Sequence, residues 1–234
     1  MQLDARELDG FYESPMGQVA RRTILRRLRL VWPSTARCRL LGFGFTIPYL
    51  RSFHVESDRV IALMPAQQGV LRWPAMKPLT VLGEEDALPF ADAMFDRILV
   101  IHGLEGADAV RPVLRQLWRV LAPEGRMAIV APNRASLWAQ IERSPFAHGR
   151  PYHRGELDRL LREAMFEPVR WDNALYGPPV NGRRIVRTGA GWDRVGRRLW
   201  PGLGGVHLVE ASKSLYAPVP IVKKKRTEPV LARA

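Results

Sequence analysis

The sequence predicts an α/β fold with a central, mostly parallel β-sheet, and two observations lead to this expectation. Short apolar runs alternate with longer amphipathic stretches along most of the chain, which is the pattern of strands joined by crossover helices. One run, "ILVIH" at 98–102, is apolar up to its last residue, as expected for a strand buried on both faces. We therefore expect a parallel sheet that helices cover on both faces.

The individual elements follow from apolar spacing and from Pro and Gly. Apolar residues recur at helical spacing over 4–31, and Pro15 and Gly17 divide this stretch into two helices. Further helices are expected near 47–53, 67–72, 108–121, 134–142, 154–164 and 189–199. The stretch 108–121 is the clearest, because apolar residues line one face and arginines the other. The expected strands are 38–43, 59–64, 79–83, 97–102, 127–131, 168–171 and 206–211.

The length and composition of the chain limit its possible domain organisation. The chain has 234 residues, enough for one domain with a large core. We expect an N-terminal helical segment at 1–35, a domain at 36–222 and a flexible basic tail at 223–234. No apolar run approaches the ~20 residues that span a bilayer. With no secretory signal pattern and Cys38 as the one cysteine, we expect a cytoplasmic protein without a disulfide.

The net charge of +13 has two interpretations. The arginines form a solvated surface, or they form a face that binds a polyanion such as nucleic acid. The residues of such a face would be Arg21, Arg22, Arg26, Arg29, Arg183, Arg184, Arg197 and Arg198. Histidines and carboxylates show no metal-ligand spacing, so no metal site is expected.

The window "TVLGEEDALPFADAMFDRILVIHGLE" at 80–105 carries acidic residues directly after a strand. Carboxylates at the C-terminal end of a parallel strand lie at the ligand-binding edge of the sheet. There Glu84 and Glu85 can accept hydrogen bonds from an amino group such as that of adenine. His102 ends the next strand, and it is either a general base or substrate contact, or a histidine bonded to backbone. For Glu105 we expect a capping or solvent-exposed role.

Three segments in this order resemble the class I S-adenosylmethionine-dependent methyltransferases, specifically their type 11 branch. They are "GEEDALPF" at 83–90 with "FDRI" behind it, "LRQLWRVLAPEGRMAIV" at 114–130, and "YHRGELDRLLREAMFEPVR" at 152–170. The resemblance spans about 36–172. It implies a Rossmann-like fold with seven strands and a C-terminal antiparallel strand. It also implies S-adenosylmethionine as cofactor and methyl transfer. A small molecule is the expected substrate, because the sequence shows no recognisable RNA-binding module.

The stretch "RLLGFGFTIPYL" at 39–50 is similar to the glycine loop of that family, "VLDLGCGTGYL". Gly42 falls on the acidic position and Gly44 on the first glycine, whereas Thr46 and Pro48 replace the next two. At the end of the second strand, Met64 replaces the acidic residue that binds ribose. The resemblance implies a cofactor site formed by Gly42, Gly44, Phe45, Met64, Glu84, Glu85 and His102.

Two interpretations of this loop remain open. It holds the cofactor in a different way, or it no longer binds it, and the protein is then a catalytically inactive methyltransferase-fold protein that binds or regulates a protein partner. In the first case Gly44 is expected to approach the ligand most closely, and the fold should tolerate Gly42→Asp. Phe11 and Tyr12 lie on the N-terminal helix, which the resemblance places over the cofactor pocket.

Overall fold

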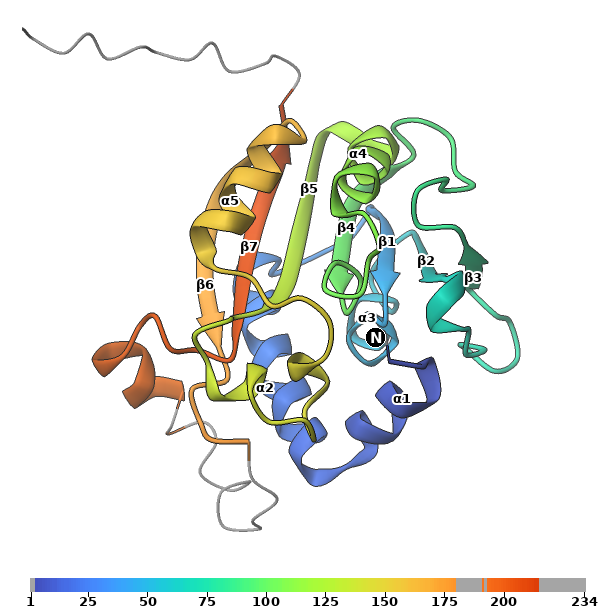
Figure 1. Cartoon of the computed structure of the whole chain (residues 1–234). Helices are drawn as coiled ribbons and strands as arrows, with labels where there is room; N and C mark the ends of the chain where they lie inside the picture. The colour runs from blue at the N-terminus through green and yellow to red at the C-terminus, as the bar shows by residue number, and fades with distance from the viewer. Residues whose placement is uncertain (1–2, 180–190, 192, 215–234) are drawn as a thin grey trace, which may run out of the picture.

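The computed structural model describes residues 3–179, 191 and 193–214, which form a seven-stranded sheet in the order β3-β2-β1-β4-β5-β7-β6 (Figure 1). The strands are β1 (Arg39–Gly44), β2 (Arg59–Pro65), β3 (Thr80–Gly83), β4 (Phe95–Ile101), β5 (Leu121–Pro132), β6 (Phe166–Ala174) and β7 (Val206–Lys213). Strand β7 runs antiparallel to β5 and β6, and the other pairs are parallel. The expected mostly parallel sheet is confirmed.

The helices are α1 (Ala5–Glu13), α2 (Pro15–Val31), α3 (Ile47–Phe53), α4 (Val110–Val120) and α5 (Arg154–Glu163). The expected break near Pro15 is confirmed. Ser14 ends α1, and its side chain also accepts from the amide of Gly17 to cap α2, with Pro15 at the first helical position. A capping box between Asp4 and Glu7 starts α1.

Two expected helices are wrong and are single 3-10 turns instead. The helix expected at 67–72 is the turn Ala66–Gln68, because Gly69 takes a φ of 80° and ends it. The helix expected at 134–142 is the turn Leu137–Ala139, where the Asn133 and Ser136 side chains bond to nearby backbone amides. A third turn spans Pro145–Ala147.

The expected elements near the C-terminus fall partly outside the described residues. Of the helix expected near 189–199, residues 193–199 are helical. The tail expected at 223–234 lies outside the described part of the chain.

Two apolar layers form the core, one on each face of the sheet. Neighbouring residues of a strand point to opposite layers, so Leu40 packs beneath α1–α3 and Leu41 beneath α4 and α5. Strands β1 to β4 are parallel, and their carboxyl ends therefore meet at one edge. Helix α1 lies across this edge (Figure 1). This places the N-terminal helix over the region where the sequence predicts the site.

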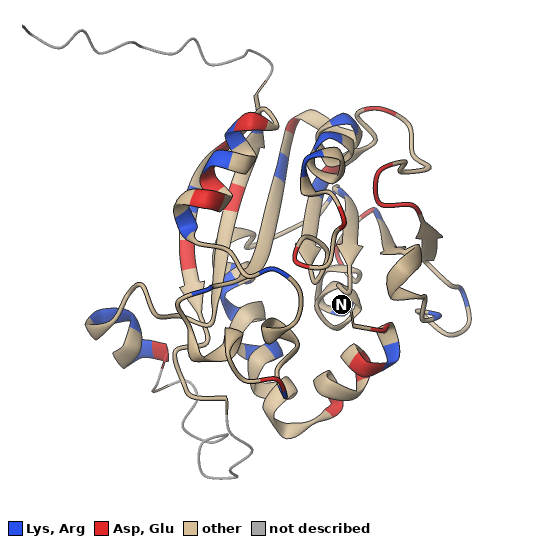
Figure 2. Ribbon diagram, in the orientation of Figure 1, with Lys and Arg blue, Asp and Glu red and all other residues tan. Residues whose placement is uncertain are grey.

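The charged residues of the described surface are mixed in sign. Basic and acidic residues alternate along α5 (Figure 2), where Arg162 pairs with Asp158 at 2.9 Å and with Glu167 at 2.7 Å. On α2, Arg29 pairs with Glu56. Arg183 and Arg184, two members of the expected basic face, lie outside the described residues. Within the described residues, no helix is both long and apolar enough to cross a membrane.

Candidate functional site

The turn after β1 is fully enclosed by protein. Phe45 and Thr46 have no exposed surface, and Ile47 at the start of α3 is 3% exposed. Gly44 takes a φ of 83°, and a Cβ atom there would lie 2.4 Å from the carbonyl oxygen of Ile101. Gly44 is thus crowded by the backbone of β4. The absence of a side chain at this position is explained by strand packing alone.

Gly42 and Thr46 fit each other. A Cβ atom on Gly42 would lie 2.1 Å from Oγ1 of Thr46 and 2.6 Å from Cδ1 of Leu50. The Thr46 side chain therefore fills the space that a side chain at position 42 would need. This packing argues against the expectation that the fold tolerates Gly42→Asp, because an added carboxylate would overlap this side chain.

His102 lies at the end of β4 in a hydrogen-bonded chain of four side chains. Its Nε2 is 2.8 Å from the hydroxyl of Tyr12, and its Nδ1 is 3.0 Å from Oε1 of Glu105. The hydroxyl of Tyr49 donates to that of Tyr12 at 3.0 Å. A carboxylate accepts from Nδ1–H, so Nε2 is the acceptor and the Tyr12 hydroxyl donates to it. Glu105 is buried beside His102 and is not the solvent-facing residue that the sequence predicts.

The backbone of His102 is held in an unfavourable conformation. Its φ is 52°, which costs a residue with a side chain about 1–2 kcal/mol. The side-chain amide of Gln68 donates to the His102 carbonyl at 2.9 Å. Strain of this kind persists where surrounding contacts fix it, and it concentrates at functional sites.

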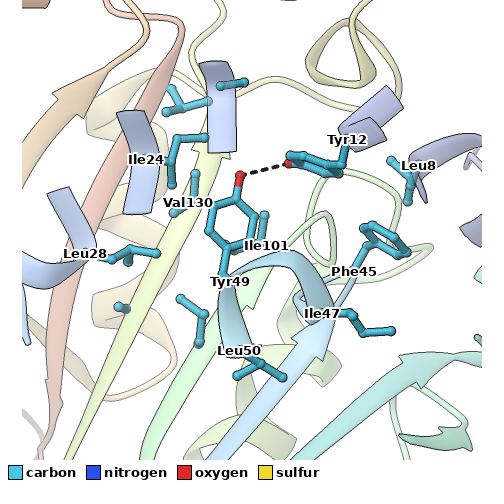
Figure 3. Close-up of a cluster of buried hydrophobic side chains, with 14 of the residues drawn as sticks. Leu8, Tyr12, Ile24, Leu28, Phe45, Ile47, Tyr49, Leu50, Ile101 and Val130 are labelled. Carbon is cyan, nitrogen blue, oxygen red and sulfur yellow. Dashed lines mark hydrogen bonds between the residues drawn. The ribbon is translucent and has the colours of Figure 1, made fainter. Parts of the chain in front are cut away.

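The aromatic side chain of Tyr12 fills the centre of the site. Its ring stacks on Phe45 with a centroid distance of 5.9 Å, and it meets the edges of Tyr49 at 5.7 Å and His102 at 5.8 Å. Figure 3 shows the rings of Tyr12 and Tyr49 pointing toward one another, with their hydroxyls joined. Burial raises the pKa of Tyr12 well above its ordinary value, and Tyr49 and Glu105 raise it further. Tyr12 is therefore a neutral phenol.

Four buried polar oxygens after β1 to β4 have no hydrogen-bond partner within the described residues. They are Oγ1 of Thr46, Oε1 of Gln68, Oε2 of Glu85 and Oε2 of Glu105. A buried polar group without a partner costs about 1–3 kcal/mol, and such groups in native structures often mark places for a ligand or water. Their gathering at one edge of the sheet favours a ligand site there.

The structure brings only part of the predicted site together. Phe45 and His102 both contact Tyr12. Glu84 is exposed, whereas Glu85 is buried and accepts from the amide of Asp108 at 3.0 Å, and burial raises the pKa of Glu85. Met64 is fully buried, and its sulfur accepts from the amide of Leu71 at 3.5 Å.

Sequence reasoning missed three participants of this site. Gln68 is a buried polar residue on a segment without a motif, whereas Tyr49 is buried within the stretch 39–50 that resembles the glycine loop, where its hydroxyl was not singled out. The spacing of His102 and Glu105, three residues apart after a strand, is a signal that could have identified their pairing.

The open space beside His102 is small. A cavity of about 20 Å³ is lined by Leu8, Gln68, His102 and Glu105, among others. A polar cleft of about 320 Å³ is lined by Tyr12 together with Asp9, Glu13, Gln18, Arg21, Pro48 and Arg51. Tyr12 lines the cleft, and its hydroxyl contacts His102, which lines the cavity.

Part of the chain matches a known protein family. The sequence profile of the family described as "Methyltransferase domain" matches residues 41–129, which include most of β1, the glycine turn and His102. This match supports a class I S-adenosylmethionine-dependent methyltransferase. A search of curated protein sequences found no match.

Solved structures share the Rossmann-like methyltransferase fold. A Thermotoga maritima S-adenosylmethionine-dependent methyltransferase, described as a possible histamine N-methyltransferase, is 18% identical with a TM-score of 0.60, over 89% of this chain and 95% of that one. A putative methyltransferase from Haloferax volcanii, in complex with the Trm112 activator, is 16% identical with a TM-score of 0.60, over 81% and 88%. The 1,6-didemethyltoxoflavin-N1-methyltransferase of Burkholderia thailandensis, with S-adenosylhomocysteine bound, is 17% identical with a TM-score of 0.53, over 86% and 79%.

These comparisons support S-adenosylmethionine as the cofactor. The space in the site must then be large enough to hold this molecule. Pockets for ligands of such size measure roughly 300–1,000 Å³. The cavity beside His102 measures about 20 Å³, and the ring of Tyr12 fills the adjoining space. With α1 in this position, the residues after β1 and β4 do not fit the cofactor.

Proposed function

We propose that this protein is an S-adenosylmethionine-dependent methyltransferase that acts on a small molecule. Its glycine loop is atypical, and its site opens when α1 moves aside. The observation that carries the proposal is the pair of unpaired buried oxygens on Gln68 and Glu105, whose side chains both bond to His102, at the edge where this family binds its cofactor. The matches to a possible histamine N-methyltransferase and to the 1,6-didemethyltoxoflavin-N1-methyltransferase support a small-molecule substrate.

The connection between α1 and α2 supports movement of α1 as a unit. Ser14 is at once the C-terminal cap of α1 and the N-terminal cap of α2, and its backbone is extended, with φ −66° and ψ 156°. Rotation at this residue would withdraw Tyr12 without unfolding either helix. Opening would also join the cleft of about 320 Å³ to the cavity beside His102, giving a space of the size that the cofactor needs.

Calorimetric titration with S-adenosylmethionine and S-adenosylhomocysteine tests this function. We expect the wild-type chain to bind at least one of them with a dissociation constant below 1 mM, about −4 kcal/mol. Tyr12→Phe removes the hydroxyl that holds α1 to His102 and Tyr49, and we expect it to bind several-fold more tightly. Tyr176→Phe is the matched control, because its hydroxyl bonds to the carbonyl of Pro201. Dissociation constants above 1 mM for all three proteins would contradict the proposal.

The enclosed aromatic packing favours a second candidate, an inactive methyltransferase-fold protein that binds or regulates a protein partner. Tyr12, Phe45 and Phe146 fill the site as core residues would, and each is at most 5% exposed. Under this function the purified protein carries no nucleoside absorbance at 260 nm and co-purifies with a stable protein. Bound nucleoside that co-elutes with the protein would exclude it.

A cytoplasmic location and the division at 1–35, 36–222 and 223–234 are also part of the proposal. The single cysteine agrees with a reducing compartment. Helices α1, α2 and α3 contribute to one apolar layer of the core. We therefore expect the segment at 1–35 to unfold together with the rest of the protein. Cell fractionation tests the location, and one cooperative thermal transition tests the coupling.

A further inference from the structure

A separate apolar cleft lies beyond the carboxyl ends of β5 and β6. It measures about 340 Å³, within the range of pockets that hold a small molecule. It shares no lining residue with the cavity beside His102 or with the polar cleft beside Tyr12. Its walls come from the turn after β5, the chain after β6 and the chain that leads into β7. They include Leu137, Trp138, Leu175, Tyr176, Trp200 and Leu203.

The walls of the apolar cleft present mainly rings and aliphatic side chains. The indole N–H of Trp138 donates to the carbonyl of Gly177 at 2.7 Å, and the Tyr176 hydroxyl donates to the carbonyl of Pro201 at 3.0 Å. The polar atoms of these two aromatic residues are therefore already bonded within the protein. The body of a ligand would meet apolar surface, and the rings favour a flat body that stacks on them.

Several large apolar side chains of this cleft remain open to solvent. Trp200 and Leu203 are each 52% exposed, and Leu137 is 58% exposed. Grouped apolar side chains on a surface mark binding sites, whereas single ones do not. In the same wall Leu175 has a φ of 65°, and backbone strain of this kind concentrates at functional sites. Both observations favour a ligand in this cleft.

Arg197 supplies a positive charge beside the cleft. The preceding residue, Gly196, lines the cleft and packs directly on Tyr176, because a Cβ atom there would lie 2.5 Å from the Tyr176 Cβ atom. Burial raises the pKa of Tyr176, and the charge of the Arg197 guanidinium opposes this rise. The Arg197 charge is therefore close enough to the cleft wall to act on a group bound there.

The carboxylates near Tyr176 already have a partner. Besides burial, the charges of Asp172 and Asp193 raise the pKa of Tyr176. Both carboxylates pair with the buried guanidinium of Arg27, at 3.8 Å and 3.4 Å. Arg197 is exposed and forms no ion pair with another described residue. Its charge is therefore available to an anion beside the cleft.

We propose that the apolar cleft is a binding site for a small amphipathic anion, whose flat apolar body packs on the cleft walls and whose acidic group pairs with Arg197. A neutral molecule of the same shape lacks this ion pair, and Arg197 repels a cation. The site goes beyond the proposed methyltransferase function and does not depend on it, because its lining residues are separate from those beside His102.

Calorimetric titration with three naphthalene probes at neutral pH tests the class of ligand. The probe 2-naphthoate carries a carboxylate, 2-naphthalenemethanol is neutral, and 2-naphthylmethylammonium is a cation. We expect 2-naphthoate to bind the wild-type chain with a dissociation constant below about 1 mM. The alcohol should bind at least threefold more weakly than 2-naphthoate, and the cation at least tenfold more weakly.

Arg197→Gln locates the acidic group of the ligand. It should weaken the binding of 2-naphthoate at least threefold and leave the binding of the alcohol unchanged. Arg198→Gln is the matched control. Gly196 and Trp200 line the cleft, and the Trp200 amide donates to the Gly196 carbonyl at 2.7 Å, as in a helix. Residue 198 is two positions from each and therefore lies on the opposite side of this turn, so its loss should change neither affinity.

Trp200→Ala locates the apolar body of the ligand. It removes a ring from the cleft wall and should weaken 2-naphthoate and the alcohol alike, each at least fivefold. Val195→Ala is the control, because this apolar side chain is 48% exposed and does not line the cleft. Circular dichroism confirms folding. Leu203→Ala, a smaller change in the same wall, takes the place of Trp200→Ala if that variant does not fold.

No binding of 2-naphthoate to the wild-type chain, equal affinities for the three probes, or equal effects of Arg197→Gln and Arg198→Gln would each overturn the proposal. Binding of 2-naphthoate that removal of the wall side chain leaves unchanged would overturn it as well. The titrations contain no S-adenosylmethionine. A failure here therefore leaves the calorimetric result for the cofactor unaffected, and the two proposals are tested separately.

Discussion

Oγ1 of Thr46 lies 2.1 Å from the point that a Cβ atom on Gly42 would occupy. These are two of the positions at which the glycine loop departs from the family pattern, one by losing an acidic residue and the other by losing a glycine. The structure shows that the two departures depend on each other, because the Thr46 side chain fits only over a glycine. The loop is therefore a packed turn in which the Thr46 side chain fills the space left by the missing side chain of Gly42.

Gly42→Ala should destabilise the protein by about 1–3 kcal/mol, because it forces Thr46 and Leu50 from their positions in a filled core. Gly42→Asp should cost more, since it adds a buried carboxylate without a partner. Urea unfolding of both variants measures these losses. Free energies of unfolding equal to that of the wild-type chain would show that the turn can shift at no cost.

Thr46→Gly should relieve the loss caused by Gly42→Asp. The second change removes the side chain that overlaps position 42, so the double variant should be more stable than the sum of the two single changes predicts. For residues in direct contact we expect a coupling of roughly 0.5–3 kcal/mol. A double-mutant cycle from urea unfolding gives this value, and the pair Gly69→Ala with Thr46→Gly, whose positions lie on separate turns, is the control for additivity. Strict additivity at Gly42 and Thr46 would contradict the steric account.

The sequence was enough to predict the sheet, because its strands are continuous apolar runs between Pro and Gly turns. The core helices α3 and α4 were also predictable, since their apolar faces have helical spacing. The short turns at Ala66–Gln68 and Leu137–Ala139 were not, because side-chain bonds and one left-handed glycine end them locally. The filling of the site by Tyr12 depends on how α1 crosses the sheet edge, and no local pattern encodes that path.

Gly44→Ala should destabilise the protein strongly and is not a clean test of ligand binding. The added methyl group would meet the Ile101 carbonyl oxygen at 2.4 Å, and the left-handed φ of 83° adds about 1–2 kcal/mol of strain. Gly69→Ala is the matched control, because Gly69 has a φ of 80° and nothing within 4 Å of an added Cβ. Thermal unfolding should show a much larger loss for Gly44→Ala. Equal losses would mean that β4 yields to the added methyl group.

Acid should destabilise the fold through His207, which lies on β7 and is 4% exposed. Its Nδ1 lies 2.8 Å from Oδ1 of Asn173, and burial lowers the pKa of His207 from 6.5 to about 4. Between pH 6.5 and 4 the unfolded chain therefore binds a proton that the folded protein does not. Stability from this group is complete above pH 6.5, is lost as the pH falls to 4, and changes no further below that. At about 1.4 kcal/mol per pKa unit, the loss is at most about 3.5 kcal/mol.

His207→Phe separates this effect from the other acid-sensitive groups. Hydrogen bonds from arginines lower the pKa values of Glu56 and Asp96, and both pairs remain in the variant. The variant should be less stable near neutral pH, because it loses the bond to Asn173, yet its free energy of unfolding should fall less between pH 6.5 and 4. Urea unfolding at a series of pH values measures both curves. Parallel curves over that interval would show that His207 protonates as readily in the folded protein as in the unfolded chain.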